Sequence, residues 1–229
     1  MRSRSTSQPS RPAGIHLLRD RRIATSMVEA AGVGPGDLVV EIGAGLGALT
    51  APLAATGARV LAVERSRRFV TRLEQRFGTT PTVRVVEADA RSVMLPHRRF
   101  AVVANIPFAI STDLLRRLMT PEDTPLATAD LIVEWGLAKR LTAKQPRDFE
   151  TAWWQARFDL RIGRRISAGA FDPPPSVDAA HLIARRRSDL RGAAGREAWA
   201  RLRAAYGITG GPSRPPRANP QRGSRSRRR

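Results

Sequence analysis

The feature that most constrains the fold is a succession of short apolar runs, three of which are followed by a stretch with helical spacing. Residues 37–42 read Asp-Leu-Val-Val-Glu-Ile, and similar runs lie at 59–63, 82–87, 100–104 and 129–133. Strands of a parallel sheet have this composition because helices cover both faces of the sheet. The alternation predicts an α/β fold, a doubly wound Rossmann-like sheet with right-handed crossovers.

The helices expected between these strands cover residues 20–31, 48–56, 66–77 and 111–119, where apolar residues recur every three or four positions. Ser66 is expected to cap the third of them, and Ser111 or Thr112 the fourth. Residues 135–150 read as a polar, basic segment. A helix end followed by a strand is expected within 153–166, and a last strand at 177–183.

The composition divides the chain into four parts. We expect a basic flexible arm at 1–13, the α/β domain at 14–187, a reduced helical C-terminal lobe at 188–206 and a disordered Arg-rich tail at 207–229. Trp153 and Trp154 are adjacent, so on a strand they would face opposite ways. Packing of both in the core is the favoured reading, with contact of one of them to a binding partner as the alternative.

The charge of the chain is strongly positive. The formal net charge is +20, and seven arginines and no acid lie between Pro212 and Arg229. This favours a polyanionic partner, because each neutralised phosphate releases counterions. The bland alternative is a solvated surface, and an Arg-rich composition can also reflect a GC-rich genome.

Other classes of protein have little support in the composition. There are no cysteines, which excludes disulfides and fits a reducing compartment, and the three histidines lie far apart. We therefore expect no metal site. No stretch approaches the roughly 18–20 apolar residues that cross a bilayer, so we expect no membrane association and a cytoplasmic location.

A glycine-rich turn, Gly43-Ala-Gly45-Leu-Gly47, follows the first expected strand. Glycines at this place let backbone amides approach a nucleoside cofactor at a helix N-terminus. The pattern also satisfies a loose dinucleotide fingerprint. Glu41, two residues before Gly43, favours the positively charged methionine end of S-adenosylmethionine, whereas it would repel a pyrophosphate. A purely structural turn remains the alternative.

Two acids end the next two expected strands. Glu64 comes about 20 residues after the glycine turn, where a carboxylate can accept both ribose hydroxyls of a cofactor. Asp89, beside Ala90, would bind the amino group of the cofactor's adenine. Each acid alone could be an exposed strand end. Their order along the chain favours a cofactor site at the carboxyl edge of the sheet.

The sharpest motif is Asn105-Ile106-Pro107-Phe108, at the end of the fourth strand. The N6 lone pair of adenine is delocalised into its ring, so hydrogen-bond acceptors that favour a pyramidal amine would help methyl transfer. The Asn105 side-chain oxygen and the Ile106 carbonyl can both accept from N6–H. Pro107 fixes the turn, and Phe108 offers a stacking face worth about 1–3 kcal/mol. An ordinary Asn-x-Pro turn is the alternative.

These motifs resemble the ribosomal RNA adenine-N6 methyltransferases, which include the small-subunit dimethylases and the Erm enzymes of macrolide–lincosamide–streptogramin B resistance. Asn105 to Phe108 is similar to the Erm form of the motif. Residues 171–178 resemble the family's Phe-x-Pro-x-Pro-x-Val-Asp connector, and 134–140 resemble the segment after its fifth strand. The likeness covers roughly residues 14–187, and it implies a methyltransferase domain there.

The resemblance implies a set of site residues. The cofactor S-adenosyl-L-methionine would be held by His16, Leu18, Glu41, Gly43, Gly45, Glu64, Asp89, Ala90 and Asn105. Candidate RNA-binding residues are Arg140, Lys144, Arg147, Arg214, Arg217, Arg222 and Arg225. The usual Gln before His16 is absent, and little of the family's C-terminal lobe remains after residue 190.

The implied function is methylation of N6 of an adenine in 23S rRNA at the macrolide-binding site, which confers antibiotic resistance. The expected protein is a monomer whose partner is 23S rRNA before full ribosome assembly. Alternatives are a small-subunit, 16S-type rRNA adenine dimethylase and a non-catalytic nucleic-acid-binding relative. A small-molecule methyltransferase is disfavoured by the charge.

Overall fold

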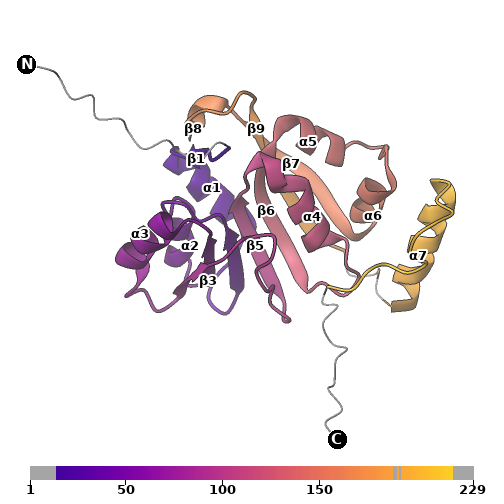
Figure 1. Cartoon of the computed structure of the whole chain (residues 1–229), viewed down its shortest axis with the longest axis horizontal. Helices are drawn as coiled ribbons and strands as arrows, with labels where there is room; N and C mark the ends of the chain where they lie inside the picture. Colours follow the sequence, from indigo (N-terminus) through magenta and orange to yellow (C-terminus); the bar gives the residue numbers. More distant parts are fainter. Residues whose placement is uncertain (1–13, 188–189, 191, 219–229) are drawn as a thin grey trace, which may run out of the picture.

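A seven-stranded sheet forms the centre of the computed structural model, which describes residues 14–187, 190 and 192–218 (Figure 1). The strand order is β4-β3-β2-β5-β6-β9-β7. The first five of these run parallel, and β9 is antiparallel to both of its neighbours. The strands are β2 (Leu38–Ile42), β3 (Arg59–Glu64), β4 (Val83–Glu87), β5 (Phe100–Asn105), β6 (Leu126–Glu134), β7 (Phe158–Ile166) and β9 (Ala179–Arg186).

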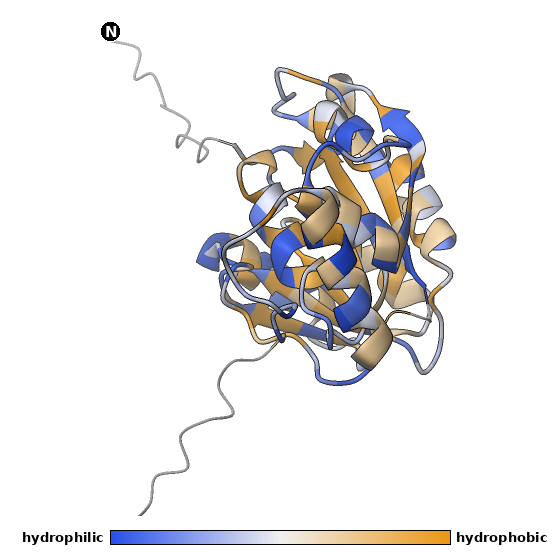
Figure 2. Ribbon diagram, turned by 90° about the vertical axis from the view of Figure 1, so that its right-hand side faces the viewer, coloured by the Kyte–Doolittle hydropathy of each residue, from blue (hydrophilic) through white to orange (hydrophobic). Residues whose placement is uncertain are grey.

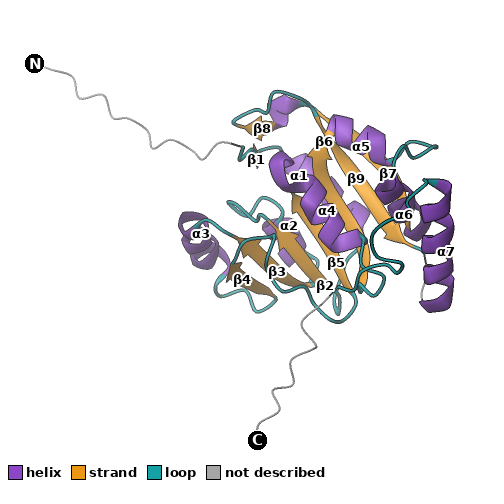
Figure 3. Ribbon diagram, turned by 45° about the vertical axis from the view of Figure 1, so that its right-hand side comes forward, coloured by secondary structure: helices purple, strands orange, loops and turns teal. Residues whose placement is uncertain are grey.

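Helices cover both faces of the sheet (Figure 3). On one face lie α1 (Arg21–Ala31), α2 (Thr50–Ala55) and α3 (Arg67–Phe77). On the other lie α4 (Ser111–Met119), α5 (Trp135–Leu141) and α6 (Phe149–Arg157), with α7 (Gly192–Ala205) packed against α6. Figure 2 shows the apolar strands between more polar helices. The predicted doubly wound α/β fold is therefore confirmed.

The pattern of burial explains why the apolar runs form the central strands. All five residues of β2 are buried, and in β5 every residue before Asn105 is buried. Asp20 precedes α1, where its side chain accepts hydrogen bonds from the backbone N–H groups of Arg22 and Ile23. A carboxylate at this position satisfies amides that have no partner within the helix.

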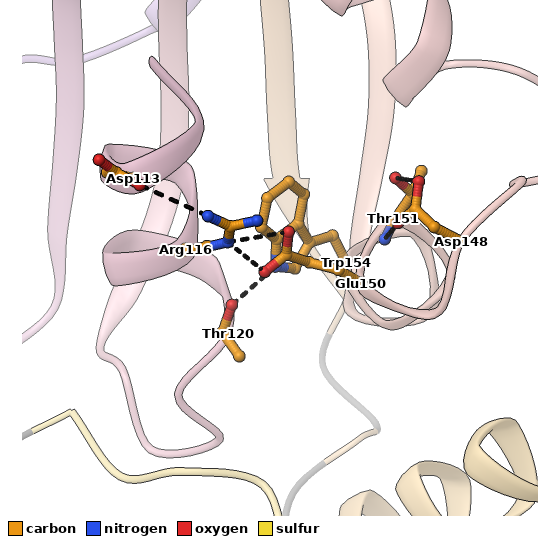
Figure 4. Close-up of polar contacts among 7 residues, drawn as sticks. All are labelled: Asp113, Arg116, Thr120, Asp148, Glu150, Thr151 and Trp154. Atoms are coloured by element: carbon orange, nitrogen blue, oxygen red, sulfur yellow. Dashed lines mark hydrogen bonds and ion pairs between the residues drawn. The ribbon is translucent and has the colours of Figure 1, made fainter. Parts of the chain in front are cut away.

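Trp153 and Trp154 do not lie on a strand; both belong to α6 (Figure 4). Both are buried, because the polar edge of each indole finds a partner on the loop after α4. Trp153 Nε1 donates to the backbone oxygen of Thr120, and Trp154 Nε1 donates to the Thr120 hydroxyl, each at 2.9 Å. Arg116 of α4 also donates to Glu150 at 2.8 Å. The favoured core reading is confirmed. The helix end and the following strand expected within 153–166 are confirmed as α6 and β7, and the two tryptophans belong to the helix.

Two other local predictions are corrected. Ser111 is the first residue of α4 and not its cap, because a short 3-10 turn, η1 (Phe108–Ile110), leads into the helix. Its hydroxyl donates to the Pro107 carbonyl at 3.3 Å. The basic segment expected at 135–150 contains α5, whose Leu137 and Leu141 pack into the core.

The segment after α7 also differs from the prediction of a tail disordered from residue 207. Residues 207–218 follow the surface of the fold, and the backbone N–H of Glu122 donates to the Pro216 carbonyl at 3.0 Å. The N–H of Ala218 donates to Asp123 at 2.6 Å. Residues 121–125 precede β6, so residues 207–218 lie at the end of the sheet opposite the carboxyl ends of the parallel strands. Residues 219–229 lie outside the described part.

A second, two-stranded antiparallel sheet was not predicted. It pairs β1 (Leu17–Leu18) with β8 (Phe171–Asp172), which follows the short 3-10 turn η2 (Ala168–Ala170). Its strands lie beside each other at one end of the molecule (Figure 1). Within the described ranges, none of the helices combines the length and apolarity that a bilayer crossing requires, and His, Asp and Glu nowhere form a cluster suited to a metal ion.

Candidate active site

The carboxyl ends of β2, β3, β4 and β5 meet at one pocket of about 220 Å³. Its lining includes the residue predicted at each strand end: Gly43, Glu64, Asp89 and Asn105. His16, Gly45, Ala90, Ile106, Pro107 and Phe108 line it as well. Leu18 and Glu41 line a smaller adjoining pocket of about 200 Å³, which shares Gly43, Gly45 and Asn105. The structure thus brings the predicted cofactor residues together across these two pockets.

The glycine turn after β2 needs its glycines for two reasons. Gly43, Gly45 and Gly47 have φ angles of 73°, 56° and 83°, a region that other residues rarely adopt. A Cβ at Gly47 would lie 2.6 Å from a ring carbon of Phe77. The Gly43 N–H donates to the Val63 carbonyl at 2.8 Å, which holds the turn against β3.

Glu64 is an organising residue of the pocket. It is buried, and its two carboxylate oxygens accept hydrogen bonds from the backbone N–H groups of Gly45 (2.9 Å) and Ser66 (2.7 Å). A carboxylate offers about four lone-pair sites, so both oxygens keep capacity for a ligand's hydroxyls. Ser66 stands before α3 as predicted, but its side chain makes no capping hydrogen bond.

Asp89 lies in a loop after β4 and is held by arginines that the sequence reasoning missed. Arg91 donates to it from its backbone N–H at 2.8 Å and from its guanidinium at 3.0 and 2.7 Å. Arg65 lies 3.7 Å away. The Arg91 hydrogen bonds hold the pKa of Asp89 well below its usual value, so the carboxylate is ionised. Arg65 and Arg91 line the pocket, and their closeness in sequence to Glu64 and Asp89 was the available signal.

Asn105 is oriented by a residue far away in sequence. Its Nδ2 donates to the backbone carbonyl of His16 at 2.8 Å, so the amide nitrogen is engaged and Oδ1 is left as the acceptor. Ile106 is buried, and its N–H donates to the Ile132 carbonyl at 3.2 Å. Phe108 is half-buried, with its ring centroid 6.0 Å from that of His16.

His16 contributes in another way than predicted. Its Nδ1 is paired with the Pro173 carbonyl at 2.8 Å, and its backbone carbonyl holds Asn105. Donation by its ring to the carboxylate of a methionine group remains a prediction for Nε2.

The structure also gives Glu41 a contact that the sequence analysis did not predict. It is buried below the glycine turn and accepts a 2.6 Å hydrogen bond from the Thr50 hydroxyl. Burial raises the pKa of its carboxyl from 4.5 to about 8. At neutral pH the carboxyl is therefore mostly protonated, and its interaction with the sulfonium of a cofactor remains a prediction. Its hydrogen bond to Thr50 ties β2 to α2.

The predicted RNA residues fall into three groups. Arg140 and Arg147 line an open pocket of about 640 Å³ that also includes Phe108, so they lie next to the motif that Phe108 ends. Lys144 is exposed in the same connection but does not line this pocket. Arg214 and Arg217 are exposed on the segment at the opposite edge of the sheet. Arg222 and Arg225 lie outside the described residues.

The sheet order, the glycine turn and the acids at successive strand ends define a methyltransferase-type α/β domain of class I. Residues 10–199 match the family described as ribosomal RNA adenine dimethylase, and the chain belongs to this family. An rRNA adenine N-6-methyltransferase of Bacillus licheniformis is 34% identical over 177 residues, which cover 77% of this chain and 62% of that protein. The chain thus spans less than two thirds of that relative.

Two further similarities bear on the substrate. The ribosomal RNA small subunit methyltransferase A of Phenylobacterium zucineum is 36% identical over 174 residues, covering 73% of this chain and 61% of that protein. The crystal structure of the 23S rRNA methyltransferase ErmE superposes with a TM-score of 0.76 at 28% identity, covering 86% of this chain and 81% of that chain.

Proposed function

We propose that this protein transfers a methyl group from S-adenosylmethionine to N6 of an adenine in 23S rRNA at the macrolide-binding site, and so confers antibiotic resistance. The observation that carries the proposal is the position of Asn105. Its amide nitrogen is fixed on His16 and its free oxygen lies at the pocket formed by Gly43, Glu64 and Asp89. Family membership and the similarity to ErmE support it.

The residues present fit the proposed cofactor. Glu64 keeps lone pairs for two ribose hydroxyls, and Asp89 is ionised and can accept from an adenine amino group. The turn at Gly43 and Gly45 brings backbone close to the ligand without side chains. When bound, S-adenosylmethionine supplies an electrophilic methyl group on a sulfonium.

The target adenine would be held by the catalytic motif. Asn105 Oδ1 and the Ile106 carbonyl accept hydrogen bonds from its amino group, which favours a pyramidal nitrogen with its lone pair aimed at the methyl carbon. Phe108 supplies a stacking face for the unpaired base. A strong base is not required, because the amino proton becomes acidic once nitrogen is alkylated, and it can leave to water.

The pocket beside Phe108 provides the entry for RNA. Arg140 and Arg147 are cations suited to the phosphates that flank the target base. We propose that the enzyme acts in the cytoplasm, as a monomer, on 23S rRNA before full ribosome assembly. The small-subunit alternative is favoured by the relatives named small subunit methyltransferase A, including one from Synechococcus at 39% identity.

Transfer of labelled methyl to protein-free 23S and 16S rRNA, with the modified base mapped, tests the proposal. Label at an adenine of the macrolide site in 23S rRNA is the expected result. Label in 16S rRNA alone would favour the alternative, and label in neither would refute an rRNA substrate. In cells, expression should raise the macrolide concentration that inhibits growth.

The Asn105→Ala variant tests the role of the motif. We expect transfer to fall at least about 100-fold, the scale found when one positioned acceptor or donor is removed from a reacting centre. Thermal unfolding should change little, because Asn105 makes one hydrogen bond, to His16. An active variant would remove Asn105 from the mechanism.

A truncation after Ala218 tests the remaining arginines. It removes five arginines, Arg222, Arg225 and those at 227–229, while keeping residues 207–218 on the fold. Binding to rRNA should weaken, and its dependence on salt should flatten because fewer phosphates are neutralised. An unchanged salt slope would show that these arginines do not bind RNA.

A further inference from the structure

The pocket beside the catalytic motif contains a carboxylate among cations. Glu134 ends β6, the strand next to β5, and lines the 640 Å³ pocket together with Phe108 and Thr112. Lys139, Arg140 and Arg147 line the same pocket. Phe108 also lines the cofactor pocket, so the two pockets adjoin at this ring.

The side chain of Glu134 makes no hydrogen bond or ion pair with any residue of the described ranges, although three cations share its pocket. Glu134 is half-buried, so both of its carboxylate oxygens are available to accept hydrogen bonds from a ligand in this pocket. The local backbone leaves room for it. A Cβ on Gly136 would lie 2.9 Å from Glu134 Oε1, so glycine at this place lets the carboxylate keep its position.

We propose that this pocket binds the nucleotide adjacent to the target adenine, and that Glu134 recognises guanine there. The inference rests on the proposed function. A carboxylate only accepts hydrogen bonds, so it selects a base edge that presents donors. Guanine presents two adjacent donors, N1–H and the N2 amino group, which match the two carboxylate oxygens. Adenine and cytosine present one amino group on that edge, and uracil one N3–H.

The neighbouring cations complete the site. A nucleotide brings a negative phosphate on each side of its sugar, and Arg140, Arg147 and Lys139 can pair with these while Glu134 faces the base. The single carboxylate would repel a phosphate, so it orients the nucleotide with its base inward.

The test uses a short rRNA hairpin that contains the mapped target adenine, with each neighbouring position carrying guanine, inosine, adenine, cytosine or uracil in turn. For the wild-type protein we expect guanine to give the highest kcat/KM at one of the two positions. Inosine, which lacks the N2 amino group, should lower kcat/KM about 10-fold, as expected for loss of one arm of a two-point contact. The other bases should lower it about as much or more.

Glu134→Gln should lose most of this preference, because an amide presents one acceptor and one donor in place of two acceptors. Gly136→Ala should weaken the same preference by displacing the carboxylate. Glu29→Gln, which removes an exposed acid on α1, is the matched control and should retain it. Cofactor binding and thermal unfolding, measured for each variant, report on folding.

Two results separate this inference from the proposed function. If wild-type protein methylates the hairpin equally well with every neighbouring base, or if Glu134→Gln keeps the guanine preference, the recognition by Glu134 is wrong and the methyltransferase function stands. If full-length 23S and 16S rRNA both remain unmethylated, the proposed function fails and this inference fails with it.

Discussion

Glu41 makes stability depend on pH, and the structure predicts both the sign and the size. Burial raises the pKa of its carboxyl from 4.5 to about 8. Between these values the folded protein binds a proton at Glu41 that the unfolded chain has released. The free energy of unfolding therefore falls as pH rises, until the pH passes the pKa of Glu41 in the folded protein. Linkage with these two pKa values gives a loss of about 2 kcal/mol between about pH 6 and about pH 8.

The Glu41→Gln variant removes this titration and keeps an acceptor for the Thr50 hydroxyl. Urea unfolding at both pH values should show wild-type protein losing about 2 kcal/mol more than the variant, since all other groups titrate alike in both. Glu29→Gln, at an exposed site on α1, should follow wild type. Equal pH dependence of wild type and Glu41→Gln would refute the burial argument. If Glu41→Gln lost more stability than wild type between the two pH values, the predicted sign of the effect would be wrong.

Three further predictions concern residues that support the site or the fold. Arg117 of α4 donates to the carbonyls of Ala90 (2.7 Å) and Val93. Arg117→Met should therefore raise the KM for S-adenosylmethionine about 10-fold with a smaller change in kcat, and Arg117→Lys should restore part of the affinity. An unchanged KM in Arg117→Met would contradict this role. Trp199 of α7 packs edge-on against Phe149 and Trp153. Trp199→Ala should therefore lower the free energy of unfolding, measured by urea denaturation, by about 3–5 kcal/mol. A loss below about 1 kcal/mol would show that α7 is loosely docked. Gly47→Ala should lower the free energy of unfolding by about 1–3 kcal/mol, because Gly47 has a positive φ and a Cβ there would meet the Phe77 ring. Gly34→Ala is the control, with open space around the position, and should be nearly neutral.

The parallel half of the fold was predictable because its signals are local. Each buried strand reads as an apolar run, and a residue at its carboxyl end lies at the common edge of the sheet. Gly43, Glu64, Asp89 and Asn105 could be assigned to one site from this rule alone. No contact between distant residues had to be known.

The other half was less predictable because tertiary contacts decide it. Trp153 and Trp154 carry no helical pattern of their own, and they are helical and buried because the Thr120 loop accepts both indole N–H groups. Glu41 shows the same limit for charge. Its place in the sequence predicts an acid near the cofactor, whereas its protonation depends on burial, which sequence spacing does not reveal.

Sequence reasoning also did not predict the contacts that orient the Asn105 side chain. In the sequence, the connector at residues 171–178 shows only a resemblance to a family motif. In the structure, its Pro173 carbonyl is hydrogen-bonded to the His16 ring, and β8 pairs with β1. These contacts fix the segment whose His16 carbonyl holds the Asn105 amide. Because an amide can rotate to present either nitrogen or oxygen, this contact decides which atom the pocket receives. In the proposed mechanism, the connector therefore supports the chemistry from a distance, by keeping the Asn105 oxygen available as the acceptor.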